Sequence, residues 1–249
     1  MFQYLPEQFK FLMSKSIIEM LDYRVVVMVP EDLFGVFDPM SVLALLLLYG
    51  PAYLSNTGAM IFGKAIPKIT GMKVWVIDSG KDWKDGNRLL GDGKSWNGLL
   101  GGPLLSGFLT MLATHLWSGN GLESKPFYDP LMAMQHVDPW FTVFGLYGSA
   151  FFIGYVLGFG SLVGDSLGSF VKRRRGLKRE GEISSKAPLL DTLPFAVVCF
   201  IFGLVLFPNQ LYGSHQLIPS MIWLLILTPI IHRSVNVFGY KIGLKSVPY

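Results

Sequence analysis

The sequence predicts an all-α integral membrane protein with five transmembrane helices, two large cytoplasmic loops and an N-terminal interfacial helix. Of its 249 residues, 51% are hydrophobic and only 15% are charged, and the mean hydropathy is +0.44. These values are far from those of an average soluble domain. The one cysteine, Cys199, excludes an intramolecular disulfide and lies in an apolar run, which favours a packing role.

Residues 1–32 are predicted to form an extension separate from a five-span membrane domain, residues 33–249. Charged side chains at Lys10, Lys15, Glu19, Asp22 and Arg24 interrupt the apolar residues of the extension. No run there reaches the roughly 20 apolar residues that span a bilayer, and an amphipathic helix at the membrane surface fits better.

The five spans are expected at about 33–62, 98–117, 140–163, 193–207 and 217–231. In the first, Asn56 is a polar side chain among apolar ones, which indicates either packing between helices or contact with a ligand. The second and third spans are rich in glycine and other small residues, which predicts close helix packing. The fourth has a short apolar part and is expected to begin near Pro188. An amphipathic tail, 232–249, follows the fifth.

Lysine and arginine are unevenly divided between the connections. Seven of them lie in the loop between spans one and two, and seven in the loop between spans three and four, whereas Lys125 is alone between spans two and three. The positive-inside rule therefore places both basic loops and the C-terminus in the cytoplasm and the N-terminus outside the cell membrane. The net charge of +4 reflects these loops, so lipid headgroups are the expected partner and nucleic acid is not.

The polar stretch Asp85–Gly102 carries the densest chemistry of the chain. Glycines at 91, 93 and 98 permit positive φ and a close backbone approach to a ligand, while Asp85, Asp92, Arg88 and Lys94 supply both signs of charge. Gly91–Ser95 resembles the end of a P-loop, but Arg88 stands where that motif requires glycine. A glycine-rich turn of this kind is commonly only a turn, although its composition also suits a metal-bound phosphate.

The second basic loop adds acids beside a run of four bases. Asp165 is expected to end the third span and Asp191 to begin the fourth on the same side of the membrane, flanking Lys172–Arg175. The run alone indicates a topological anchor. With carboxylates beside it, a site that holds two anionic substrates around a divalent metal is the better interpretation. A nucleoside triphosphate and an anionic lipid form a natural pair.

Taken in order, these residues resemble the archaeal CDP-archaeol synthase family, which is related to bacterial and eukaryotic phosphatidate cytidylyltransferases. The resemblance covers about residues 51–249. It rests on Pro51-Ala52 with Asn56, Pro67, Asp78, Asp85-Gly86, Leu90–Gly98, Gly164–Arg174, Leu190-Asp191, His232, Asn236 and Tyr240–Tyr249. The sequence departs from the family at Leu193-Pro194, where the family commonly has a second acid. A mechanism that needs two carboxylates at this place is therefore not expected, and the acidic role is expected to fall mainly on Asp165 and the first loop.

The resemblance implies Mg²⁺-dependent transfer of CMP from CTP to 2,3-di-O-geranylgeranylglycerol 1-phosphate, with release of pyrophosphate. Phosphate attack on phosphate is slowed by repulsion, so metal and cationic groups are the expected catalysts. The implied catalytic residues are Asp92, Lys94, Asp165 and Lys172. The implied metal ligands are Asp92, Asp165, Asp191 and Asp85, with Asp78 as a further candidate. The implied substrate-binding residues are Asn56, Arg88, Gly91, Gly93, Arg173 and Arg174, the last shared with a topological role.

Two alternatives remain at the level of sequence. A small membrane transporter or channel subunit would place acids near the bilayer midplane, often in repeated halves, whereas here the charges lie at helix ends and no internal repeat is found. A phosphatidate cytidylyltransferase acting on ester lipids would have the same loop chemistry. The residues that contact the lipid tails are not identified by any motif.

Overall fold

The computed structural model describes residues 37, 39–117, 143–177, 188–206 and 217–241, which belong to one compact unit beginning at Phe37. The predicted extension, 1–32, lies outside them. No strand forms among the described residues, where two isolated β-bridges lie in the connection before α5. The all-α prediction is confirmed. The helices are α2 (Pro39–Tyr53), α3 (Ser55–Met60), the π-helix η2 (Ile61–Ala65), α4 (Ile66–Thr70), α5 (Trp96–Trp117), α6 (Gly145–Arg174), α7 (Pro188–Leu206) and α9 (Leu217–Lys241).

Four helical stretches are long and apolar enough to cross a membrane. They are Leu45–Thr70, Trp96–Leu116, Gly145–Arg174 and Leu189–Leu206. The fifth predicted span corresponds to α9, whose apolar part, Ile218–Ser234, is shorter. The structure therefore supports a membrane protein with four spanning helices among the described residues, and the count of five stays a prediction.

The first span lies further along the chain than the predicted 33–62. Pro51 lacks the N–H that would continue the α2 ladder, and α2 ends two residues later. The chain resumes as α3, η2 and α4 without another interruption until Gly71, which has a φ of 72° and terminates α4. The predicted loop beginning at Lys64 is therefore wrong at its start, because residues 64–70 are helical and the loop covers 71–95.

The third span is also longer than predicted. Asp165, directly after Gly164, is predicted to close this helix. Instead α6 continues past Asp165 to Arg174, and Gly164, one of the glycines predicted to pack, is buried against α7 together with Gly168. Asp165 and three bases of the Lys172–Arg175 run are thus helical, while α7 begins at Pro188 as expected.

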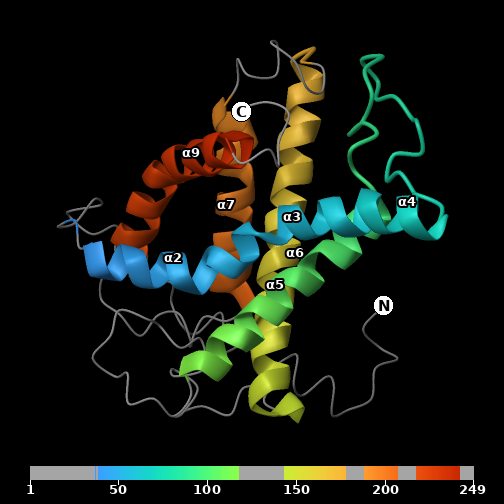
Figure 1. Ribbon diagram of the computed structural model, residues 1–249. Coiled ribbons are helices and arrows are strands. Elements are labelled where there is room, and N and C mark those ends of the chain that lie inside the picture. The colour runs from blue at the N-terminus through green and yellow to red at the C-terminus, as the bar shows by residue number, and fades with distance from the viewer. Residues whose placement is uncertain (1–36, 38, 118–142, 178–187, 207–216, 242–249) are drawn as a thin grey trace, which may run out of the picture. The chain divides into compact units, whose positions relative to one another are not determined.

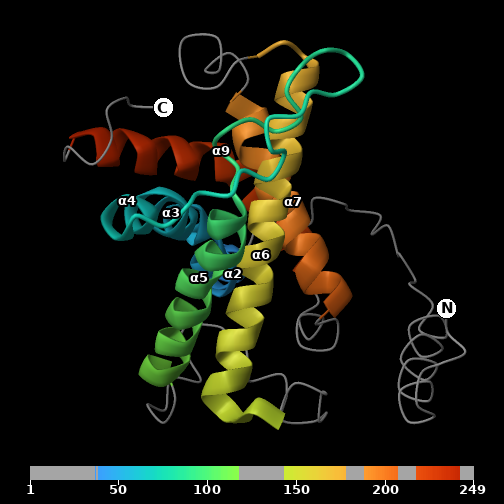
Figure 2. The same cartoon turned by 90° about the vertical axis from the view of Figure 1, so that its right-hand side faces the viewer.

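Helix α6 is the centre of the packing, with α5 on one side and α7 on the other (Figures 1 and 2). Small residues let the backbones approach: a Cβ at Gly154 would lie 2.3 Å from Oγ1 of Thr110 on α5, and one at Gly164 would lie 2.2 Å from the Pro194 carbonyl oxygen on α7. This confirms the predicted close packing of the glycine-rich spans, which in a bilayer depends on van der Waals contact.

A buried apolar cluster joins α2, α6, α7 and α9. Tyr49 packs edge-on against Phe200, with ring centroids 4.7 Å apart, and Leu157 and Leu224 complete the cluster. Cys199 is fully buried there, and its Sγ lies 3.4 Å from the Leu157 carbonyl oxygen. The packing role predicted for this cysteine is confirmed.

Candidate active site

The connection between α4 and α5, residues 71–95 (here the α4–α5 loop), is held closed by backbone hydrogen bonds at two levels. At its base, the Ile77 N–H donates to the Lys94 carbonyl at 2.9 Å and the Trp96 N–H to the Trp75 carbonyl at 2.8 Å. Towards its tip, the Trp83 N–H donates to the Asn87 carbonyl at 2.8 Å. The loop is therefore a defined structure despite having no strand.

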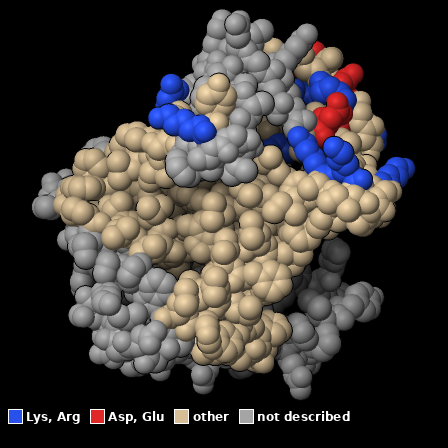
Figure 3. Space-filling model, viewed as in Figure 1, with Lys and Arg blue, Asp and Glu red and all other residues tan. Residues whose placement is uncertain are grey.

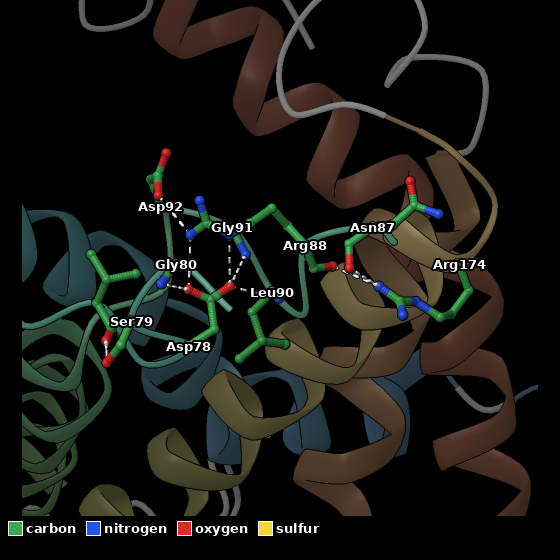
Figure 4. A network of polar contacts seen from close by, with 10 residues as sticks. Asp78, Ser79, Gly80, Asn87, Arg88, Leu90, Gly91, Asp92 and Arg174 are labelled. Atoms are coloured by element: carbon green, nitrogen blue, oxygen red, sulfur yellow. Dashed lines mark hydrogen bonds and ion pairs between the residues drawn. The ribbon is translucent and has the colours of Figure 1, made fainter. Parts of the chain in front are cut away.

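Asp78 organises the interior of this loop (Figure 4). Its side chain is buried and accepts hydrogen bonds from the backbone N–H groups of Gly80, Leu90 and Gly91 at 3.1, 3.0 and 2.8 Å. Arg88 donates to it from Nη2 at 2.8 Å. Burial by itself opposes ionisation, but Arg88 and the three N–H groups outweigh it and hold the pKa of Asp78 well below its usual range. Asp78 is thus a structural anchor with its oxygens already occupied.

Arg88 connects this anchor to the surface. The Nη2 atom that contacts Asp78 also lies 2.8 Å from Oδ1 of Asp92, whose side chain is 76% exposed. The two carboxylates raise the pKa of Arg88. Arg88, which is fixed by Asp78, therefore also holds the exposed carboxylate of Asp92 in position.

The last turns of α6 dock onto the loop. Lys94 forms an ion pair with Asp165. Arg174 lies 2.7 Å from Asp85. It also donates to the carbonyls of Asn87 and Arg88 at 3.1 and 2.6 Å (Figure 4). Desolvation by itself raises the pKa of Asp85, but the hydrogen bonds from Asn87 and the charge of Arg174 together outweigh it and lower this pKa. Arg174 thus fastens the loop tip to α6.

Aromatic contacts strengthen the same junction. Trp83 meets Phe170 of α6 edge-on, with centroids 5.6 Å apart, and the Arg174 guanidinium lies 4.9 Å from the centroid of that ring. Trp83 therefore packs partly on α6, and 46% of its surface stays exposed.

The end of α6 also contacts α7. Lys172 forms an ion pair with Asp191, and a Cβ at Gly168 would lie 2.7 Å from the Leu190 carbonyl oxygen. Asp165 and Lys172 are two helical turns apart and share one face of α6. The Lys94–Asp165 and Lys172–Asp191 pairs therefore lie along one stripe where the loop, α6 and α7 meet.

Of the predicted loop glycines, only Gly91 has the positive φ that was expected, 94°. A Cβ there would also lie 3.3 Å from Nε of Arg173, so the close neighbour is this guanidinium. Gly93 and Gly98 do not have a positive φ, and Gly98 packs in α5 against Ala59. The conformational prediction is confirmed at Gly91 and wrong at the other two.

The structure thus brings most of the predicted site residues to one junction. Asp85, Arg88, Asp92, Lys94, Asp165, Lys172, Arg174 and Asp191 each take part in an ion pair there. Among the described residues, no three acidic, histidine or cysteine side chains form a ready-made metal cluster. Asn56 lies apart on α3 and is exposed, whereas its neighbours Ser55 and Gly58 are buried. That exposure argues against the helix-packing interpretation.

The anchoring role of Asp78 and the clamp of Arg174 on two carbonyls were not predicted. A signal for the first exists in Asp78-Ser79-Gly80, since an aspartate two residues before a glycine N–H is typical of an Asx turn. The second has no local signal, because Arg174 and Asp85 are 89 residues apart.

Comparisons with known proteins agree with this architecture. The family model described as "CarS-like: CDP-archaeol synthase" matches residues 39–249. A CDP-archaeol synthase of Thermococcus gammatolerans is 35% identical over 199 residues, covering 80% of this chain and 91% of that protein. One of Methanospirillum hungatei is 36% identical over 202 residues, covering 80% and 99%. A solved structure described as an intramembrane enzyme for archaeal membrane lipid biosynthesis is 27% identical, with a TM-score of 0.50, covering 79% of this chain and 94% of that one.

Proposed function

The chain belongs to the CDP-archaeol synthase family, and we propose that it transfers CMP from CTP to 2,3-di-O-geranylgeranylglycerol 1-phosphate at the junction of the α4–α5 loop, α6 and α7. Family membership makes it a lipid cytidylyltransferase of the membrane. The observation that supports the location is the stripe of paired charges, Lys94–Asp165 and Lys172–Asp191, at the end of α6. Lys172 lies in the last turn of α6, Asp191 in the first turn of α7 and Lys94 just before α5, while Asp165 lies further inside α6. Charges that gather mostly at helix ends favour this enzyme over a transporter.

The reaction joins two anions. An oxygen of the lipid phosphate attacks the α-phosphorus of CTP, the bond from that phosphorus to the bridging oxygen of the β-phosphate breaks, and pyrophosphate leaves with that electron pair. CMP remains attached to the lipid phosphate as a diphosphate. Little covalent chemistry is required of the protein, so its task is to align the phosphates and neutralise their charge.

Three cations are placed for this task. Lys94 and Lys172 are held by Asp165 and Asp191, with side chains 20% and 14% exposed. Arg173 lies against the Gly91 backbone. We assign these three to the phosphates of CTP and lipid. Arg88 and Arg174 are committed to carboxylates and carbonyls of the loop, so we assign them to positioning the loop in place of the substrate contact predicted for them.

The carboxylates at the junction fit a magnesium ion. The hydrogen bond of Lys94 is to Oδ2 of Asp165 and that of Lys172 is to Oδ1 of Asp191. We assign the other oxygen of each carboxylate to the metal. Mg²⁺ commonly binds one or two carboxylates together with substrate phosphates and water, so a cluster of three acids is not required. Asp165 and Asp191 would hold it, with Asp92 as a third ligand. When bound, the ion neutralises phosphate oxygens and polarises the α-phosphorus.

Asp85 and Asp78 fit the metal less well than predicted. Asp78 is saturated by backbone N–H groups and Arg88, and Asp85 is engaged by Arg174. Pro194, where the family commonly has an acid, lies inside α7 with its carbonyl against Gly164. The weight of metal binding therefore falls on Asp165, Asp191 and Asp92.

The ion pairs also suggest how charge is balanced when the substrates bind. Each lysine is neutralised by a carboxylate, so the free site is electrically balanced. CTP brings negative charge for the lysines and Mg²⁺ brings positive charge for the carboxylates, so binding exchanges partners without leaving a charge uncompensated. Both loops and this site face the cytoplasm in the proposed topology, where CTP is available, and the N-terminus lies outside.

The function is tested by incubating purified protein with radiolabelled CTP, Mg²⁺ and either geranylgeranylated glycerol phosphate or phosphatidic acid. Label is expected in the ether lipid, is expected to disappear when EDTA removes the metal, and is expected to return with added Mg²⁺. Lys94→Met should abolish it, while Lys81→Met, an exposed lysine of the same loop, should not. Label confined to the ester lipid would replace the substrate assignment. No label with either lipid in folded protein would refute the proposed reaction.

A further inference from the structure

The segment Lys64–Trp75 (here the interfacial segment) runs from the end of the first span into the α4–α5 loop. Its basic residues differ from those of the candidate active site in having no acidic partner among the described residues. Its lysines, Lys64, Lys68 and Lys73, are exposed, and none forms an ion pair with another described residue. By contrast, Arg88, Lys94, Lys172 and Arg174 at the junction are all paired with acids. These three lysines therefore have their charge directed outward.

Large apolar side chains are interleaved with these lysines. Ile69 is 84% exposed, Trp75 61% and Met72 55%. In Figure 3 the blue lysine and arginine atoms beside the end of α4 border a broad uncharged surface that covers the helices. Lysine and tryptophan mixed with exposed aliphatic side chains at the end of a spanning helix are typical of the layer where lipid headgroups meet acyl chains.

The segment is tied to the catalytic loop through α5. Asn97 accepts a hydrogen bond from the Trp75 N–H at 2.9 Å, and its amide nitrogen lies 3.4 Å from the Lys73 carbonyl. The Trp75 carbonyl in turn accepts from the Trp96 N–H at 2.8 Å. These hydrogen bonds fix the interfacial segment to the base of the α4–α5 loop. The position of the segment at the membrane therefore also sets the position of the loop.

We propose that the interfacial segment lies in the headgroup layer and binds anionic lipid headgroups through Lys64, Lys68 and Lys73, holding the α4–α5 loop at the membrane surface. Charge complementarity selects this occupant: three lysines that pair with no acid in the described part of the chain attract a negative surface, while Ile69, Met72 and Trp75 enter the adjoining apolar layer. A soluble acidic protein could also pair with the three lysines. It would not explain why the exposed apolar side chains of the segment continue the lipid-facing surface of the first span. The binding is distinct from the binding of substrate at the α6 junction.

The test places a fluorescent bimane at Met72→Cys in the full chain, reconstituted into phosphatidylcholine vesicles with a minor fraction of phosphatidylglycerol. Cys199 is fully buried, so labelling of the parent chain serves as the background measurement. Bromine, which quenches bimane on contact, is carried on the phosphatidylglycerol in one preparation and at the same mole fraction on phosphatidylcholine in the other. We expect quenching by the brominated anionic lipid to exceed that by the brominated neutral lipid by about threefold or more, and the difference to shrink in about 1 M salt.

The triple substitution Lys64→Gln, Lys68→Gln, Lys73→Gln should make the two lipids equal in quenching. The matched control, Lys81→Gln, Lys84→Gln, Lys241→Gln, removes the same charge from exposed lysines outside the segment and should retain the preference. Equal quenching by both lipids in the Met72→Cys protein, or a preference that survives the triple substitution, would overturn the proposal. Absence of quenching by either lipid would place the segment in water or under protein and overturn it as well. CTP is not involved, so failure here leaves the proposed reaction untouched.

Discussion

Replacing Asp78 with asparagine is expected to open the α4–α5 loop while leaving the helices folded. Asp78 is 3% exposed and its carboxylate faces only donors: Arg88 and the N–H groups of Gly80, Leu90 and Gly91. Asparagine removes the charge and turns an NH₂ group towards some of these donors. Arg88 is then left without its buried partner, which is the costly way to break such a pair.

The magnitude follows from the burial. Removing one partner of a buried ion pair costs about 3–5 kcal/mol, which corresponds to an increase of about 10²–10⁴ in the population of the open loop at 1.36 kcal/mol per tenfold. The helices should be little affected, because the loop joins them mainly through Lys94, Trp83 and the contacts of Arg174. Amide hydrogen exchange at Leu90 and Gly91 should accelerate by this factor, with trypsin cleavage after Lys81 or Lys84.

Asp92→Asn is the matched control. Asp92 is bound by the same nitrogen of Arg88, but its side chain is 76% exposed, and such a pair contributes about 0–1 kcal/mol. Exchange at Leu90 should change by less than about fivefold. The reasoning is refuted if Asp78→Asn leaves loop exchange at the parent rate, if Asp92→Asn opens the loop equally, or if Asp78→Asn melts the helices.

Three further outcomes are expected. Asp165→Asn and Asp191→Asn should each lower CMP transfer by about 100-fold or more with unchanged membrane insertion, measured with labelled CTP, and full activity in both would contradict the metal assignment. Gly164→Ala should destabilise the protein by about 1–3 kcal/mol in detergent melts, because its Cβ would lie 2.2 Å from the Pro194 carbonyl, whereas Gly50→Ala, with no atom within 4 Å, should not; equal melting temperatures would contradict this. Because the folded pKa of Asp78 is lowered, its contribution to loop stability should be complete above the ordinary aspartate value of about 3.9 and be lost only as pH falls towards the lowered value. The protection factor at Gly91, which is the exchange rate corrected for the intrinsic rate at each pH, should therefore stay constant between pH 7 and 5, and a fall in it would be the opposite result.

Sequence reasoning succeeds here where the signal is local. The apolar runs around Leu43–Leu48 and Val197–Leu206 predict helices, because no other structure satisfies backbone groups in a bilayer. Reasoning fails where packing overrides propensity. Asp165 is predicted to end the third span, but α6 continues past it, and Gly164 and Gly168 on either side of it are points at which α7 approaches closely. Glycine has a low intrinsic helix propensity, but the close packing of these two glycines against α7 stabilises the helix.

The candidate site shows the same division. The types and order of its residues are visible in the sequence, and so is their family resemblance. Their pairing is not, because Lys94 and Asp165 are 71 residues apart and Lys172 and Asp191 are on different helices. Local charge patterns cannot distinguish Asp78, whose two oxygens accept hydrogen bonds from the loop, from Asp165, which among the described residues accepts a hydrogen bond from Lys94 at one oxygen. Only burial and the count of donors around each carboxylate separate a structural acid from one that can bind a metal.

The end of α6 explains why a single basic run serves several purposes. Successive side chains on a helix are turned by about 100°, so Lys172 contacts α7 at Asp191, Arg173 lies against Gly91, and Arg174 holds Asp85 and the loop tip. The helix dipole also favours cations at this C-terminal end. A topological anchor would need only the charge of these residues, in any order. The three distinct contacts made by three consecutive residues require their order, and this argues that the run was shaped by the site as well as by the membrane.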